Sequence, residues 1–279
     1  MEAGLVGAGT MGSGIALAFA IHEEYRVTLC DIDEHLAEDG KRRISAKLDR
    51  LARKGKVTAD TAAAVVARIS TGALESLAPC ELVVEAASED MRVKRELFAA
   101  LQKVCGVDCI FATNTSSLSI TEMGQDLGRG LIGMHFFNPA DVMALVEVVA
   151  GADTAPETVA RVKDIALSIG KTPVEVKESG GFVVNRLLIP MINEAVGIYA
   201  EGLASVDDID TAMRLGANHP MGPLALGDLI GLDVCLAIME VLHAEFGDDK
   251  YRPHPLLRKM VRGKSLGRKT GKGFFPYTT

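Results

Sequence analysis

Apolar positions in the first 178 residues follow two alternating patterns. Short runs rich in β-branched residues predict strands, and longer stretches with apolar residues three and four positions apart predict helices. Regular alternation of the two predicts a parallel, doubly wound sheet with flanking helices. The predicted strands are Ala3–Val6, Arg26–Asp31, Leu82–Glu85, Cys109–Thr113, Leu131–Phe137, Leu145–Val149 and Thr172–Val176. The predicted helices are Met11–Ala20, Glu34–Lys54, Thr58–Ile69, Val93–Lys103 and Pro156–Ile169.

One connection in this part of the chain is too short for a helix. The run at Leu145–Val149 follows the run at Leu131–Phe137 after only a few residues. A parallel pair of strands needs a crossover of a dozen or more residues. We therefore expect part of the sheet to be antiparallel.

The pattern changes after Gly180-Gly181, where the remaining hundred or so residues have helical periodicity. Ser205 followed three residues later by Asp208 is a helix-start signal. The chain is thus predicted to form an α/β domain over residues 1–178 and an all-α domain over residues 182–279. The predicted helices of the second domain are Phe182–Glu201, Val206–Leu215, Leu224–Phe246 and Leu256–Val261.

Composition and charge exclude several classes of function. The formal net charge of −7 argues against broad binding to nucleic acid. No apolar run is long enough to span a membrane, and no signal peptide precedes the first predicted strand, so we expect a cytoplasmic protein. Cys105 and Cys109 lack a second Cys/His pair at ligand spacing. The five cysteines are therefore expected to be reduced packing residues, with no metal bound.

A glycine-rich turn follows the first predicted strand. In the segment Gly7-Ala-Gly-Thr-Met-Gly12, the first glycine permits a tight turn and the second lets a pyrophosphate approach the backbone. The third glycine allows close packing of the following helix, whose N-terminus offers amide donors to phosphate. The turn therefore predicts a dinucleotide-binding, Rossmann-type first domain. Its expected cofactor-binding residues are Gly7, Gly9, Thr10, Met11 and Gly12.

Asp31 indicates which dinucleotide is bound. It lies at the end of the second predicted strand, nineteen residues after Gly12. A carboxylate there accepts hydrogen bonds from both ribose hydroxyls of NAD and repels the 2′-phosphate of NADP. No arginine follows until Arg42, so NAD is favoured over NADP. Asp33, by contrast, fits a helix N-cap.

His135 and Glu147 are candidates for acid–base chemistry. The histidine stands where a strand is expected to end in a loop, and the glutamate lies in the next predicted strand. A carboxylate beside an imidazole fixes its tautomer and raises its basicity, as a general base near neutral pH requires. Most pairs at such a spacing are a structural histidine and an exposed glutamate, so the functional interpretation depends on the nucleotide-binding motif upstream.

Four basic residues share one face of the predicted helix Glu34–Lys54. They are Arg43, Lys47, Arg50 and Lys54, and we call them the cationic face. An ordinary solvated helix face would account for them. The alternative is a binding surface for an anionic ligand, because like charges on one face repel each other unless an anion compensates them.

The motifs together resemble the 3-hydroxyacyl-CoA dehydrogenase family, most closely the short bacterial 3-hydroxybutyryl-CoA dehydrogenases. The resemblance extends over essentially the whole chain. It rests on Gly7–Gly14, Val84–Ala86, Asn114–Leu118, His135–Pro139, Leu145–Val148, Gly181–Arg186, Asp208–Met213, Pro220–Pro223 and Gly267–Phe274.

The resemblance implies reversible hydride transfer between NAD and C3 of a short-chain acyl-CoA, which interconverts (S)-3-hydroxybutyryl-CoA and acetoacetyl-CoA. In that reaction His135 is the acid/base and Glu147 orients it, and Ser116 and Asn185 are polar partners of the substrate oxygen and the histidine. The residue types agree, because alcohol oxidation needs a proton acceptor and donors for the growing carbonyl.

Further implied contacts concern the cofactor, coenzyme A and the partner subunit. Arg50 and Lys54 are implied to bind the 3′-phosphate-ADP of coenzyme A, with Ser116 and Asn185 at the acyl end. The second domain is implied to complete the substrate site and to form a homodimer. Leu187–Ala195 is a candidate for the dimer face, and the alternative for this apolar stretch is the core of its own domain. The implied cofactor contacts are Gly7, Gly9, Gly12, Asp31, Glu89, Lys94, Ser116, Asn138 and Lys269.

Two alternatives remain open from the residues. A β-hydroxyacid dehydrogenase acting on a non-CoA substrate shares this architecture and uses a lysine base, for which Lys94, Lys171 and Lys269 are candidates. A non-catalytic NAD-binding protein of the same fold is the other, because fold alone does not establish activity.

Overall fold

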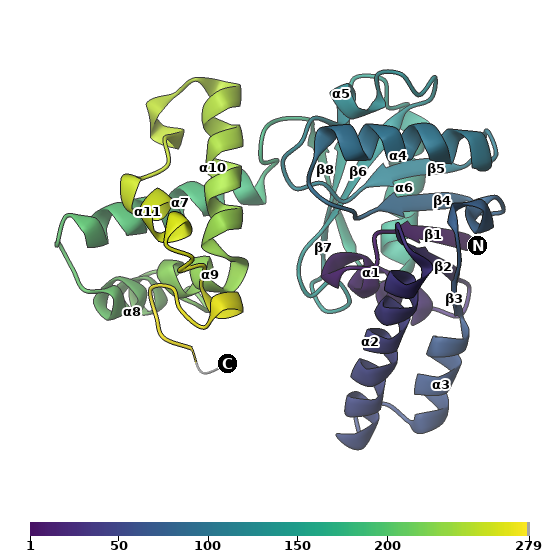
Figure 1. The fold of residues 1–279 in the computed structure, drawn as a ribbon, viewed down its shortest axis with the longest axis horizontal. Coiled ribbons are helices and arrows are strands. Elements are labelled where there is room, and N and C mark those ends of the chain that lie inside the picture. Colours follow the sequence, from purple (N-terminus) through teal and green to yellow (C-terminus); the bar gives the residue numbers. More distant parts are fainter. Residues whose placement is uncertain (278–279) are drawn as a thin grey trace. The chain divides into compact units, whose positions relative to one another are not determined.

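The computed structural model describes residues 1–277 and divides the chain into two compact units that meet at Glu178 and Ser179. The first unit is an eight-stranded sheet flanked by helices (Figure 1). Its strands are β1 (Glu2–Val6), β2 (Arg26–Cys30), β3 (Ile69–Thr71), β4 (Leu82–Glu85), β5 (Ile110–Thr113), β6 (Leu131–Phe136), β7 (Leu145–Ala150) and β8 (Thr172–Lys177). Its helices are α1 (Thr10–Ala20), α2 (Glu34–Arg53), α3 (Ala59–Ala67), η1 (Leu74–Leu77), α4 (Met91–Val104), α5 (Ile120–Gly124) and α6 (Pro156–Ser168).

The sheet has the order β3-β2-β1-β4-β5-β6-β7-β8. All neighbours are parallel except β6 and β7, which are antiparallel, so the expectation of a mixed sheet is confirmed. The order reverses direction between β1 and β4, and in such sheets ligands bind outside the carboxyl ends of the strands at this reversal. The ends of β1, β2, β4 and β5 are therefore where the predicted site residues should be sought.

Short elements of the first unit differ from the prediction, and η1 is one that was not predicted. The predicted helix Thr58–Ile69 ends at Ala67, and Ile69 instead begins β3. This edge strand has only three residues, too few to show a period of two. The five-residue helix α5 was not predicted either, because it is little more than one helical turn.

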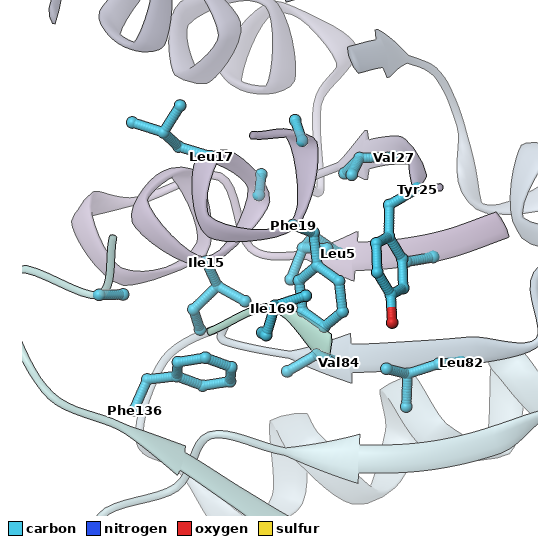
Figure 2. Close-up of a cluster of buried hydrophobic side chains, with 14 of the residues drawn as sticks. Leu5, Ile15, Leu17, Phe19, Tyr25, Val27, Leu82, Val84, Phe136 and Ile169 are labelled. Carbon is cyan, nitrogen blue, oxygen red and sulfur yellow. The ribbon is translucent and has the colours of Figure 1, made fainter. Parts of the chain in front are cut away.

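A large apolar cluster joins α1 and α6 to one face of the sheet (Figure 2). Ile15 and Phe19 of α1 meet strand residues such as Leu5 and Val84, while Ile165 comes from α6. The opposite face is covered by α4. There Phe98 packs on Phe111 of β5, with ring centroids 5.8 Å apart.

Alternation along β6 and β7 sets the direction of the candidate catalytic side chains. Met134 and Phe136 of β6 and Val146 and Val148 of β7 all belong to the cluster on the α1/α6 face. Because successive side chains in a strand point to opposite faces, the residues between them point away from that cluster. His135 and Glu147 are residues of this second kind.

The second unit is helical, as predicted. Its elements are α7 (Val184–Ala200), α8 (Val206–Gly216), α9 (Pro223–Ile230), α10 (Leu232–Phe246), η2 (Asp249–Tyr251), α11 (Pro255–Arg262) and η3 (Arg268–Thr270). The single predicted helix Leu224–Phe246 is wrong, since it is two helices separated at Gly231. Gly231 has φ of 104°, which ends α9, while the apolar residues on both sides conceal the break in the sequence pattern. The core of this second unit includes Ile189, Ile192 and Leu242.

Asp228 of α9 binds residues 274–277 to this unit through hydrogen bonds. Its fully buried carboxylate accepts hydrogen bonds from the amides of Phe274 and Phe275, at 3.0 and 2.9 Å, and from the Tyr277 hydroxyl. Burial raises the pKa of Asp228, and the three hydrogen bonds oppose that shift. A side chain at Gly273 would overlap this carboxylate, since its Cβ would lie 1.9 Å from Oδ1.

Candidate active site

The nucleotide loop, residues 7–12, leads from β1 into α1. Gly7 has φ of +97°, and a Cβ there would lie 2.5 Å from the carbonyl oxygen of Ala86. A Cβ on Gly12 would lie 1.7 Å from the Gly7 oxygen, so neither position has room for a side chain. A Cβ on Gly9 would meet nothing within 4 Å, which leaves an open approach to the backbone beside the N-terminus of α1. Thr10 and Met11 form the first turn of that helix.

Asp31 directly follows β2 and lies against this loop. Its Oδ2 accepts a hydrogen bond of 2.6 Å from the amide of Ala8, and its Oδ1 accepts one from the amide of Ile32. Asp33 instead caps α2 by accepting from the amide of His35. Asp31 therefore lies against the nucleotide loop, whereas Asp33 is the N-cap of α2.

The cationic face is divided between internal bonds and solvent. Arg43 donates to the carbonyl oxygen of Ala8 in the nucleotide loop, and Lys47 pairs with the largely buried Asp141 at 2.6 Å. Arg50 and Lys54 are exposed. Two of the four cations thus make bonds within the fold, and two remain exposed at the surface.

A groove of about 610 Å³ runs beside this helix. It is lined by Thr10 of the nucleotide loop, Asn138 after β6, and Arg50, while Arg53 lines it in place of Lys54. Sequence spacing missed Arg53, because it falls one position outside the four-three-four series. Since the groove includes Thr10 of the nucleotide loop and is lined by three arginines, Arg43, Arg50 and Arg53, it suits an elongated anionic ligand.

His135 and Glu147 are brought together by strand register. They are directly paired residues of β6 and β7, and the Nδ1 atom of the imidazole lies 2.8 Å from Oε2 of the glutamate. Both are nearly inaccessible to solvent, at 4% and 1% exposed. The ring of Phe137 packs against the imidazole at 4.6 Å between centroids. This contact is the carboxylate–imidazole pair that the sequence predicts.

Ser116 lies in the loop after β5, and its backbone is fixed by Glu89. The Oε1 atom of Glu89 accepts hydrogen bonds from the Ser116 amide, at 2.8 Å, and from the Thr115 hydroxyl. Asn114, which sequence reasoning used only as part of a motif, accepts from the amide of Phe136 and so joins this loop to β6 next to His135.

Lys94 is buried and forms ion pairs with two carboxylates, those of Glu85 and Glu89. It lies 2.6 Å from Oε1 of Glu85 and 3.3 Å from Oε2 of Glu89. The sequence analysis used Glu85 only as part of the motif Val84–Ala86, because a glutamate at the end of an apolar strand has no spacing that marks it as a site residue.

The remaining predicted site residues belong to the second unit. Asn185 is a buried residue in the first turn of α7. Lys269 lies in η3 and pairs with Asp233 at 2.6 Å. The third lysine considered as an alternative base, Lys171 of the first unit, donates to the carbonyl oxygen of Met143, and burial lowers its pKa. Lys94, Lys171 and Lys269 thus all have internal partners.

Both halves of the chain match known family models. Residues 2–179 match the NAD binding domain of 3-hydroxyacyl-CoA dehydrogenase, and residues 181–277 match the C-terminal domain of the same family. The chain belongs to the 3-hydroxyacyl-CoA dehydrogenase family. The predicted family and fold class are thereby confirmed.

Several members of the family are similar over their whole length. A 3-hydroxybutyryl-CoA dehydrogenase of Clostridioides difficile is 52% identical, with 99% of each chain covered. The human mitochondrial hydroxyacyl-coenzyme A dehydrogenase is 39% identical over 98% of this chain and 90% of its own. The crystal structure of (S)-3-hydroxybutyryl-CoA dehydrogenase from Ralstonia eutropha has a TM-score of 0.93 and 46% identity, covering 100% of this chain and 99% of that one.

The first unit of this 3-hydroxyacyl-CoA dehydrogenase family member fits the nicotinamide dinucleotide that its domain is named for. The backbone around Gly7 and Gly12 has no room for a side chain, and the space beside Gly9 is open. Asp31 lies beside the same loop. None of the helices within residues 1–277 is long and apolar enough to cross a membrane.

Proposed function

We propose that this chain catalyses the reversible, NAD-dependent interconversion of (S)-3-hydroxybutyryl-CoA, or another short-chain 3-hydroxyacyl-CoA, and the 3-oxoacyl-CoA. The observation that carries the proposal is the buried His135–Glu147 pair, with 2.8 Å between Nδ1 and Oε2. It lies on β6 and β7, in the same sheet as β1, the strand that the nucleotide loop follows. The names of the similar proteins support the same reaction class.

In the proposed mechanism His135 moves the proton. Because Nδ1 is held by Glu147, Nε2 is the atom that takes the proton from the 3-hydroxyl during oxidation and returns it during reduction. Glu147 stabilises the imidazolium formed in this step, as a carboxylate does for a catalytic histidine. When bound, the nicotinamide supplies the hydride acceptor or donor. Ser116 and Asn185 are proposed to position the substrate oxygen.

NAD is the proposed cofactor, rather than NADP. The carboxylate of Asp31 lies 2.6 Å from the Ala8 amide of the nucleotide loop, where the adenosine ribose of a dinucleotide is bound in this fold. A 2′-phosphate there would meet the negative charge of Asp31. Glu89, Lys94, Asn138 and Lys269 complete the proposed cofactor contacts.

One assay tests the reaction and the cofactor together. Purified protein is mixed with acetoacetyl-CoA and either NADH or NADPH, and the loss of nicotinamide absorbance is followed. We expect oxidation of NADH and much slower oxidation of NADPH. No oxidation of either would support the alternative of a non-catalytic NAD-binding protein, and a preference for NADPH would refute the role of Asp31. Turnover of a free 3-hydroxy acid in place of the thioester would favour a β-hydroxyacid dehydrogenase.

Exchanging Arg50 and Lys54 for alanine is expected to weaken binding of coenzyme A. Exposed cations that contact a phosphate contribute modestly, so the double variant should raise KM for acetoacetyl-CoA by about tenfold with little change in kcat. The effect should vanish for an acetoacetyl thioester truncated before the ADP group. Lys103→Ala on α4 removes an exposed cation from another helix and serves as the control. An equal rise in KM for both substrates would refute ADP binding by this face.

The second unit is proposed to complete the substrate site and to form a homodimer. Leu187 on α7 is 72% exposed, and Leu203, shortly after the same helix, is 74% exposed. A contiguous exposed apolar patch marks a protein interface, and these two leucines are the candidates for its centre. A molar mass of one chain, measured by light scattering at micromolar concentration, would refute the dimer.

A further inference from the structure

Glu85, Lys94 and Glu89 form a cluster of charged side chains, two of which are buried. Glu85 is the last residue of β4 and Lys94 belongs to α4, and they are 0% and 1% exposed. Their ion pair measures 2.6 Å. Glu89, whose side chain is 40% exposed, completes the cluster at 3.3 Å from the lysine. Charged groups are buried at a large cost in free energy unless they are paired, so the arrangement requires an explanation.

Glu85 makes hydrogen bonds to the backbone and to a neighbouring strand as well as its ion pair with Lys94. Its Oε1 accepts from the amide of Ala87, and its Oε2 accepts from the hydroxyl of Thr113 at the end of β5. Lys94 in turn holds Glu89, which fixes the amide of Ser116. A continuous series of contacts therefore links the buried Glu85 to the loop that carries Ser116.

The cluster also carries excess negative charge. Two carboxylates share one ammonium group, which gives a net charge of −1. The sheet order places it on the side of β4 and β5, whereas Asp31 at the end of β2 lies on the adenosine side. Because a dinucleotide binds across the reversal between β1 and β4, its nicotinamide half comes to the side of the cluster.

We propose that Glu85 is a positioning residue that, through Lys94, keeps Glu89 and the Ser116 loop in place and biases the site toward the oxidised, cationic nicotinamide ring. This inference rests on the proposed function. The ring carries one positive charge in NAD⁺ and none in NADH, while the rest of the molecule is unchanged. A net negative cluster therefore stabilises the oxidised form more, and Glu85 contributes one of the two carboxylates that face the single ammonium group of Lys94.

The affinities of the two redox forms report this bias. At an effective dielectric constant of about 20, a unit charge acting over about 10 Å changes an affinity by about tenfold, which sets the scale of the expected effect. Glu85→Gln changes the net charge of the cluster from −1 to zero. We expect the ratio Kd(NAD⁺)/Kd(NADH), measured by calorimetric titration without acyl-CoA, to rise by about tenfold in this variant.

Two further variants separate charge from position. Glu85→Asp keeps the charge and shortens the side chain, so it should weaken both forms equally and leave the ratio unchanged. Glu81→Gln removes an exposed carboxylate just before β4, at the opposite end of the same strand, and should leave both affinities unchanged. If Glu85→Gln does not fold, as judged by circular dichroism, Glu89→Gln removes one charge from the exposed end and should raise the ratio in the same direction.

An unchanged ratio in a folded Glu85→Gln protein, or an equal shift in Glu85→Asp, would overturn the inference. Such a result leaves the proposed function intact, provided that the wild type binds NADH and reduces acetoacetyl-CoA. Absence of NADH binding by the wild type would instead refute the proposed function.

Discussion

His135→Ala is expected to lower kcat for acetoacetyl-CoA reduction by about 10²–10⁴-fold, the usual contribution of a general acid or base. The imidazole lies on β6 and pairs with Glu147, whereas the nucleotide loop follows β1, so Kd for NADH should stay within about threefold of the wild-type value. Steady-state kinetics and nucleotide titration measure the two quantities separately.

His35→Ala is the matched control, because this histidine is exposed in the first turn of α2. It should leave kcat unchanged. Glu147→Gln should lower kcat less than His135→Ala, because a carboxamide can still orient the ring but cannot stabilise the imidazolium by charge. If His135→Ala retained activity within about tenfold of the wild type, the assignment of His135 as the acid/base would be wrong.

Asp228→Ala is expected to lower the free energy of unfolding by about 3–5 kcal/mol, as breaking a buried charged hydrogen-bond network does. The change removes the shared acceptor of the Phe274 and Phe275 amides and of the Tyr277 hydroxyl. Urea unfolding followed by circular dichroism measures the loss. Hydrogen exchange at the amides of Phe274 and Phe275 should accelerate before global unfolding.

Asp207→Ala serves as the control for this variant. Asp207 is exposed in the first turn of α8, where a carboxylate contributes about 1 kcal/mol or less. Equal losses in the two variants, or unchanged exchange at Phe274 and Phe275, would show that Asp228 does not hold the C-terminal segment.

Periodicity predicted most of the fold because most elements are long and strongly patterned. The failures have local physical causes. The edge strand at Ile69 is too short for a period to appear, and the break at Gly231 is a positive φ within a continuous apolar stretch. An isolated glycine inside such a stretch is a weak signal for a helix end.

The candidate site was predictable where it depends on neighbouring strands and not where it depends on distant contacts. The pairing of His135 with Glu147 follows from two adjacent strands. No sequence pattern shows that Lys47 pairs with Asp141, ninety-four positions away, or that Lys94 is shared by Glu85 and Glu89. Only the folded chain separates the cations that stabilise it from the cations available to a ligand.

The antiparallel pairing of β6 and β7 makes the His135–Glu147 pair depend on a shorter stretch of sequence than the groove does. His135 and Glu147 lie on consecutive strands joined by residues 137–144, so bringing them together closes only a short loop and costs little chain entropy. The groove instead joins Thr10, Arg50 and Asn138, which requires contacts of high sequence separation. Acid–base chemistry is thus a local property of one hairpin, whereas ligand recognition is a property of the completed domain.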